Sequence, residues 1–136
     1  MSLTDGLLPA LLDKVNLVLA AMTALRLPMK VCQGVRTAEY EHALWLLGRD
    51  AQGHVTDAKA IVTNCDGYCV KSNHQQKEDG FGHAVDCCFV GADPFLKADS
   101  LAVLKWRAYG AAGKAVGLRW GGDFTSPIDD DHLELL

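Results

Sequence analysis

Three short segments of this sequence carry side chains that could hold a metal ion and activate water. Two histidines plus one Asp or Glu, with a fourth position left for water, form a common ligand set for catalytic zinc. Such an ion lowers the pKa of its water to about 7, and a second carboxylate beside that water can accept its proton. The three segments are Ser72-Asn73-His74, Gly82-His83-Ala84-Val85-Asp86 and Asp129-Asp130-Asp131-His132-Leu133-Glu134.

Spacing alone does not choose between a zinc site and a plainer interpretation. A histidine in a loop is usually solvated, and an aspartate at a strand is often a cap or a salt-bridge partner. The run from Asp129 to Asp131 is, by itself, typical of a solvated acidic turn. Ligand identity therefore depends on geometry, which spacing does not supply.

In order along the chain, the segments resemble the superfamily of D-alanyl-D-alanine carboxypeptidases and L-alanyl-D-glutamate endopeptidases, which includes many phage endolysins. The patterns are Ser-x-His, Gly-x-Ala-Val-Asp and Asp-x-x-His-x-Glu. In addition, residues 33–37 are similar to that family's Gln-Gly-x-Arg-Thr segment, and residues 120–124 to its Trp-Gly-Gly-Asp-Trp segment. The five segments span Cys32 to Leu136, which makes the resemblance specific.

The resemblance implies a metal site and a base. His74, Asp86 and His132 would bind Zn²⁺, and Asp129 would be the general base and acid. Asp129 precedes His132 by three residues, close enough for both to face one site. Glu134 is the main rival for the base, since residues two apart in a strand share a face.

The resemblance also implies a substrate site and an activity. Arg36 would hold the substrate carbonyl and stabilise the oxyanion, and Ser72 would line the same site and orient a ligand by hydrogen bonding. The implied activity is zinc-dependent hydrolysis of a peptide bond in the stem peptide of bacterial peptidoglycan. An endolysin of the L-alanyl-D-glutamate endopeptidase type is favoured over a D,D-carboxypeptidase.

The chain departs from the family pattern at three places. His74 and Asp86 are 12 residues apart, more than usual, so we expect the inserted segment 75–81 to bulge outward. Phe124 replaces a tryptophan. His83 lies three residues before Asp86, so in a strand the two should point to opposite faces. In the acidic run, we expect Asp130 and Asp131 to face solvent.

The cysteines allow an alternative, a non-catalytic zinc-binding structural or interaction domain. Cys65, Cys69 and His74, completed by Cys87-Cys88, could form a closed cysteine-rich site. Their spacing matches no standard zinc knuckle. The plainer hypothesis places Cys87 and Cys88 with Cys32 in the core as small apolar residues, and Cys65 and Cys69 in a loop. An odd number of cysteines, 5, argues against a disulfide framework.

Composition narrows the class of protein. The 136 residues fit one domain spanning 1–136, for which we assume a monomer. The net charge of −4 with scattered Lys and Arg excludes the basic surface of a nucleic-acid-binding protein. The apolar stretch from Leu7 to Leu27 is interrupted by Asp13 and Lys14, so we expect a helix and neither membrane insertion nor a signal peptide. The expected location is the host cytoplasm before release to peptidoglycan in the periplasm or wall.

The helices and strands that must position these residues indicate an α+β fold. In this fold a small antiparallel sheet is flanked by helices, and the zinc site lies on the sheet. Apolar periodicity predicts helices over 9–26, 37–47 and 100–116, the second capped by Thr37. It predicts strands over 29–35, 83–90, 118–120 and 132–135, with a further candidate at 60–63. For the last helix, the predicted inner face is Leu101, Leu104, Ala108, Ala112 and Ala115.

Overall fold

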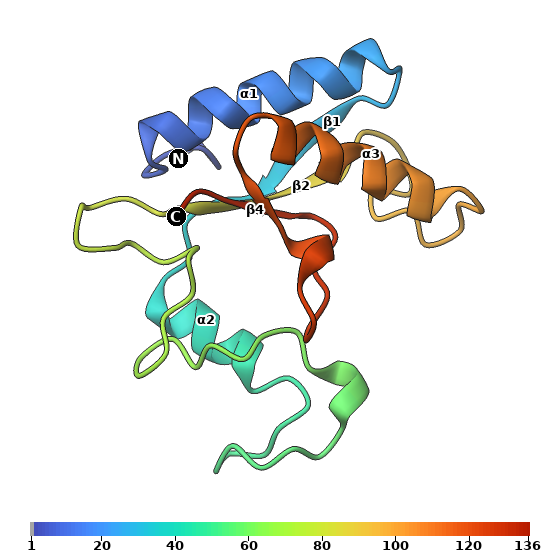
Figure 1. The fold of residues 1–136 in the computed structure, drawn as a ribbon. Helices are drawn as coiled ribbons and strands as arrows, with labels where there is room; N and C mark the ends of the chain where they lie inside the picture. The colour runs from blue at the N-terminus through green and yellow to red at the C-terminus, as the bar shows by residue number, and fades with distance from the viewer. Residues whose placement is uncertain (1) are drawn as a thin grey trace.

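The predicted α+β class is confirmed by a computed structural model, which describes residues 2–136. Two helices, α1 and α3, cover one side of an antiparallel sheet, and α2 lies on the other side (Figure 1). The four strands are ordered β1-β2-β4-β3. The helices are α1 (Pro9–Ala24), α2 (Ala38–Trp45) and α3 (Ala102–Ala115), and the strands are β1 (Met29–Gln33), β2 (Ala84–Phe89), β3 (Arg119–Trp120) and β4 (His132–Glu134).

Helix α1 closes the core and, as predicted, is amphipathic. Pro9 stands at its start, where a missing N–H costs nothing. Its buried residues recur at helical spacing and pack in the same core cluster as α3 and the sheet. They are Leu11, Val15, Val18 and Met22. Within residues 2–136 no helix combines the length and the apolar character that a membrane span requires.

The pairing of β1, β2 and β4 brings together residues that are far apart in the sequence. Asp86 on β2 lies opposite His132 on β4 and, on its other side, opposite Gln33 on β1. The β1 register shifts between Val31 and Gln33, as expected for an extra residue in one strand. Two of the chemistry-bearing segments are therefore adjacent at the middle of the sheet.

For α3, the predicted inner face is confirmed at Ala108 and Ala112, which pack against the core, and is wrong at the other three residues. Leu101, Leu104 and Ala115 are exposed, because the helix turns a face of aromatic residues and glycines toward the core. A Cβ on Gly110 would clash with the ring of Trp120, so this face is shaped for close approach to β3. The residues that α3 buries are Trp106, Tyr109, Gly110 and Gly113.

Helix α2 and the long polar segment 49–82 form the wall on the other side of the sheet (Figure 1). Thr37 caps α2 as predicted, accepting a hydrogen bond from the backbone N–H of Tyr40. The candidate strand 60–63 is wrong: a 3₁₀ turn, η1 (Ala58–Ala60), precedes irregular chain. There the Thr63 carbonyl accepts from Arg49 and takes no part in a ladder.

Candidate metal centre and active-site cleft

The three predicted metal ligands meet at the middle of the sheet. His74 Nε2 lies 3.1 Å from His132 Nδ1 and 3.2 Å from Asp86 Oδ1, and His132 Nδ1 lies 3.4 Å from Asp86 Oδ1. Tetrahedral zinc with ligand bonds of about 2.0–2.1 Å needs ligand atoms about 3.3 Å apart. The triangle formed by these three atoms therefore has the size of one face of a zinc tetrahedron.

Hydrogen bonds on the outer side of each ligand fix its orientation. His74 Nδ1 donates to the carbonyl of Gly34 at 3.0 Å, and His132 Nε2 donates to Glu134 Oε1 at 2.6 Å. Because both acceptors lack a proton to give, each of these two rings, in its neutral form, presents the lone pair of its inner nitrogen to the site. Among residues 2–136, the buried Asp86 Oδ1 has no hydrogen-bond partner. Three electron-rich atoms facing one another fit a bound cation.

The charges of the site are strongly coupled. Burial opposes ionisation of Asp86, but the neighbouring imidazoles of His132 and His74 hold the pKa of this carboxyl below its usual range. Burial likewise disfavours the charged form of His132, yet Asp86 and Glu134 raise its pKa to about 9. A metal ion bound here would replace the proton on His132, because a ligating imidazole must be neutral.

The turn that carries His74 is fixed by its neighbours. Ser72 Oγ accepts from the backbone N–H of His74 at 3.1 Å, so Ser72 orients the ligand through its main chain. The carbonyl of His74 in turn accepts from the backbone N–H of Arg36 at 2.9 Å. The first contact fixes the loop internally, and the second ties it to the chain that follows β1.

The inserted segment 75–81 does not separate the ligands. Its chain turns back at Gly80 (φ +87°), and the N–H of Lys77 donates to the carbonyl of Phe81 at 2.9 Å. Segment 75–81 thus forms a loop that turns back, as predicted, and the chain then enters β2. His74 and Asp86 consequently meet despite their separation in the sequence.

Asp129 stands at the edge of the ligand triangle. Its Oδ2 lies 3.6 Å from His132 Nδ1, and its side chain is 37% exposed, so the carboxylate is next to the site and open to the cleft. The Trp-Gly-Gly segment positions it: the Asp129 N–H donates to the Gly121 carbonyl at 2.9 Å, and the indole N–H of Trp120 donates to the Asp130 carbonyl at 2.7 Å.

The prediction for Asp131 is wrong, while that for Asp130 is confirmed. Asp130 is exposed, but Asp131 is half-buried and its carboxylate lies within 4.8 Å of those of Asp86 and Asp129. Burial, the charge of Asp86 and a hydrogen bond with Asp129 raise the pKa of Asp131 to about 9. Identical neighbouring residues offer no sequence signal that separates the inward side chain from the outward one.

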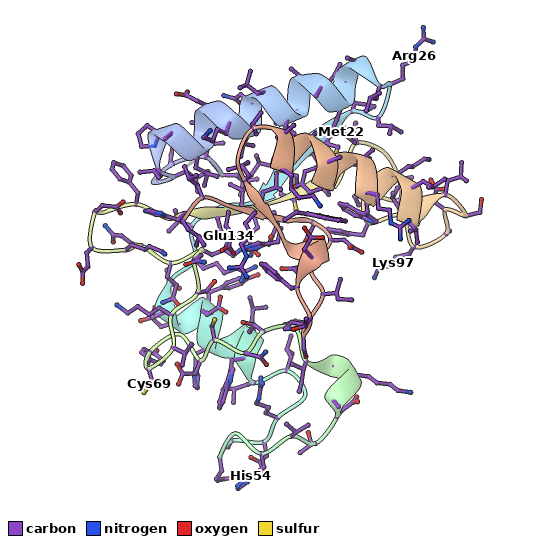
Figure 2. The ribbon with its side chains drawn as sticks, in the orientation of Figure 1. Met22, Arg26, His54, Cys69, Lys97 and Glu134 are labelled. Carbon is purple, nitrogen blue, oxygen red and sulfur yellow. The ribbon has the colours of Figure 1, made fainter. Side chains whose placement is uncertain are left out.

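Glu134 lies on the far side of His132 from the ligand triangle. Its Oε1 accepts from His132 Nε2, whereas the nitrogen that faces the other ligands is Nδ1. Its Oε2 accepts from Asn73 Nδ2 at 2.9 Å. The buried Glu134, labelled in Figure 2 between the sheet and α2, is thus placed to orient His132 and not to reach water on the inner side.

Arg36 lies against Asp86 in a buried ion-pair network. Its Nη2 donates to Asp86 Oδ2 at 2.9 Å, its Nη1 donates to Glu41 Oε2 at 3.0 Å, and both Nε and Nη2 donate to Gln33 Oε1. Glu41 is fully buried and also accepts from Thr63 Oγ1 at 2.9 Å. In the sequence Glu41 is only a favourable charge in the first turn of a helix, so its role as the anchor of Arg36 was missed.

A cleft of about 640 Å³ opens over these residues. Arg36, Ser72 and all three candidate ligands line it, together with Asp129. The opposite wall is apolar and comes from α2 and the chain that follows it. The apolar residues of that wall are Leu44, Leu47 and Val62. The cleft therefore combines the candidate metal centre with room for an extended ligand.

The other candidate ligands lie elsewhere. Both ring nitrogens of His83 face acceptors away from the site: Nε2 lies 2.7 Å from Asp79 Oδ2 and Nδ1 lies 3.0 Å from the Leu135 carbonyl oxygen. Within residues 2–136, no group of side chains suited to hold a metal ion includes a cysteine. Cys87 and Cys88 are buried core residues as predicted, whereas Cys32, which was predicted with them, is only half-buried. Cys65 and Cys69 lie in the polar segment 49–82.

We expect a double variant, Cys65→Ser with Cys69→Ser, to keep its metal and its activity, because neither thiol belongs to a group of metal-ligand atoms among residues 2–136 and serine nearly preserves the shape of Cys65, which lines the cleft. Metal content of the purified variant, measured alongside the unaltered protein, checks this. Loss of metal from a variant that still unfolds cooperatively would instead support the cysteine-rich structural site.

The fold and site define an α+β protein with a two-histidine, one-aspartate candidate metal centre in a cleft, and two solved structures share the fold. One is the Serratia marcescens L-Ala D-Glu endopeptidase ChiX, with 19% identity, TM-score 0.56 and coverage of 98% of this chain and 84% of ChiX. The other is a mutant of the vancomycin resistance D,D-pentapeptidase VanY in complex with Zn(II), with 19% identity, TM-score 0.61 and coverage of 98% and 76%.

A family comparison agrees with the structural one. Residues 69–135 match the family model described as D-alanyl-D-alanine carboxypeptidase. This range holds four of the five segments that carry the resemblance, in the same order, together with all three candidate ligands. The resemblance to the superfamily of D-alanyl-D-alanine carboxypeptidases and L-alanyl-D-glutamate endopeptidases is thereby confirmed.

Proposed function

We propose that this chain is a zinc-dependent peptidase that hydrolyses a peptide bond in the stem peptide of bacterial peptidoglycan. One observation carries the proposal: His74 Nε2, His132 Nδ1 and the unpartnered Asp86 Oδ1 form a buried triangle of zinc-ligand size that opens on a cleft. The family match and the two peptidase structures support the substrate class.

The residues of the cleft divide the chemistry among them. Zinc held by His74, Asp86 and His132 supplies a Lewis acid and lowers the pKa of a water molecule to about 7. Asp129, beside the triangle and partly exposed, accepts a proton from the attacking water and delivers it to the leaving amine. The guanidinium of Arg36 lines the same cleft and stabilises negative charge that develops on the substrate carbonyl oxygen.

The finer proposal is cleavage of the L-alanyl-D-glutamate bond by an endolysin that acts as a monomer. ChiX, described as an L-Ala D-Glu endopeptidase, shares the fold and supports this choice. VanY, described as a D,D-pentapeptidase, shares it equally well. The two activities differ in the peptide bond that they cut, so an experiment that identifies the cleaved bond decides between them.

Metal removal and restoration test the proposal. Purified peptidoglycan incubated with the protein should lose turbidity, chelation should stop the loss, and added zinc should restore it. The alternative, a non-catalytic zinc-binding domain, predicts bound zinc with no hydrolysis under any of these conditions. The placement of Asp129 favours the enzyme, because a silent metal site has no use for a base beside it.

Arg36→Ala should lower the rate about a hundredfold, as loss of one oxyanion donor does, and should also destabilise the fold. The sequence alone indicated an effect on turnover more than on folding. The structure adds a folding cost of about 3–5 kcal/mol, typical of breaking a buried ion pair, because fully buried Glu41 would lose its cation. Steady-state rates and chemical denaturation measure the two effects.

Glu41→Gln is the matched variant for Arg36. It removes the anchor but leaves the guanidinium, so it should lose stability and retain more activity than Arg36→Ala. An Arg36→Ala protein with wild-type turnover would show that Arg36 is only a structural residue.

A further inference from the structure

Arg119 is a cation of the cleft whose hydrogen-bond donors are not used by the fold. It begins β3, lines the cleft and has a side chain that is 58% exposed. The nearest carboxylate is that of Glu134, with Nη1 to Oε2 at 3.6 Å, which is longer than a hydrogen bond. Within residues 2–136 its guanidinium makes no side-chain hydrogen bond of normal length, so its planar fork of N–H groups is open to a ligand.

The guanidinium is nevertheless held in position. Its carbon lies 4.9 Å from the ring centroid of Phe124, a cation–π distance. The Phe124 ring in turn lies 5.5 Å from the ring of His132. Arg119, Phe124 and His132 therefore lie in a row of neighbouring side chains, which we call the stack and which ends at a candidate metal ligand, although the Phe124 and His132 rings are tilted by 56°. A guanidinium that is held one aromatic ring away from a candidate metal ligand is placed to bind a charged group of the substrate next to the scissile bond.

The other charges near this stack are already paired. Arg36 is engaged by Glu41 and Asp86. Asp123 pairs with Lys114 at 3.1 Å. Arg119 thus differs from Arg36, the other arginine of the cleft. It is held by an aromatic ring and has no carboxylate within hydrogen-bond distance.

The remaining acid beside Arg119 is also engaged. Glu134 accepts from His132 through Oε1 and from Asn73 through Oε2. Lys71 also lines the cleft, but it is exposed and no aromatic ring of residues 2–136 holds it in a cation–π contact. Of the Lys and Arg side chains that line the cleft within residues 2–136, Arg119 alone is both held by an aromatic ring and free of a carboxylate within hydrogen-bond distance.

We propose that Arg119 binds a free carboxylate of the substrate outside the scissile bond, so that the cleft selects an acidic stem peptide over its amidated form. Guanidinium and carboxylate groups form two parallel charged hydrogen bonds, which an amide cannot reproduce with the same charge. This inference rests on the proposed peptidase function for the identity of the ligand. It adds a specificity-determining contact on the side of the cleft next to β3.

The test compares a stem tetrapeptide with free carboxylates with the same peptide amidated at every carboxylate. Dissociation constants are measured by calorimetry on zinc-loaded Asp129→Asn protein, which should bind without turnover, and kcat/KM is measured on protein with Asp129 intact. We expect the acid form to bind about ten- to a hundredfold more tightly, the range for a hydrogen bond to a charged group. Arg119→Gln should remove that preference, and the loss should fall on KM.

Two further variants separate charge from geometry. Arg107→Gln removes the same charge at an exposed site on α3 outside the cleft and should keep the preference. Arg119→Lys should keep only part of it, because an ammonium lacks the planar fork.

The outcomes distinguish this inference from the peptidase function. Cleavage with no acid preference, or a preference that survives Arg119→Gln, overturns the inference and leaves the function intact. Acid-selective binding that depends on Arg119, without any cleavage, supports the inference and overturns the hydrolytic function. Absence of both binding and cleavage overturns both.

Discussion

Asp129→Asn should bind zinc normally and lose most peptidase activity. The asparagine keeps the shape of the side chain but cannot accept a proton, and general acid–base catalysis contributes roughly 10²- to 10⁴-fold. The metal site should survive, because His74, Asp86 and His132 supply three ligands and catalytic zinc needs its fourth position open. Zinc content and the rate of peptidoglycan hydrolysis, measured on the same preparation, check both parts.

Three neighbouring acids serve as controls for Asp129. Asp130→Asn changes an exposed side chain and should stay active. Glu134→Gln alters the support of His132 and should reduce activity without abolishing it, because outer partners of a ligand typically contribute about 10- to 100-fold. Asp131→Asn probes the acid that the structure places beside Asp129. A wild-type rate in Asp129→Asn together with an inactive Asp131→Asn or Glu134→Gln would assign the base to another residue.

His74→Ala should lose both zinc and activity. The change removes one corner of the ligand triangle and leaves Asp86 Oδ1 buried opposite a single imidazole. The loss of metal affinity should exceed the roughly 10- to 100-fold cost of losing an outer partner. Elemental analysis after dialysis against a weak chelator measures it.

His83→Ala is the matched control for His74, since it removes a histidine from the same region of the sequence. Its ring contacts Asp79 and the Leu135 carbonyl outside the site, so zinc content should be unchanged. Full zinc occupancy in His74→Ala would contradict the assignment of His74 as a metal ligand.

The sequence predicted those parts of the fold that depend on local patterns. The 3.6-residue spacing of Leu11, Val15, Val18 and Met22 was sufficient for α1, and Thr37 was recognisable as a cap. The face of α3 was not predictable from aliphatic residues, because Gly110 packs closely against the ring of Trp120, which belongs to a different element, β3.

In the candidate site, too, the sequence predicted the residues that belong to local motifs and missed those whose roles depend on contacts between segments. The candidate ligands and Asp129 were identified through ordered motifs, and antiparallel pairing of Asp86 with His132 explains why separate motifs meet. Glu41 and Asp131 were missed because their roles depend on burial against residues from other segments. The open fork of Arg119 was missed for the same reason: only the structure shows which cations already have partners.

Mass spectrometry of purified peptidoglycan digested by the zinc-loaded protein tests the central claim most directly. The account predicts fragments with a new amino terminus inside the stem peptide, at D-glutamate if the favoured bond is cut, and none after chelation or with Asp129→Asn. Intact stem peptides after prolonged digestion by the zinc-loaded protein, or cleavage confined to the glycan strand, would contradict it.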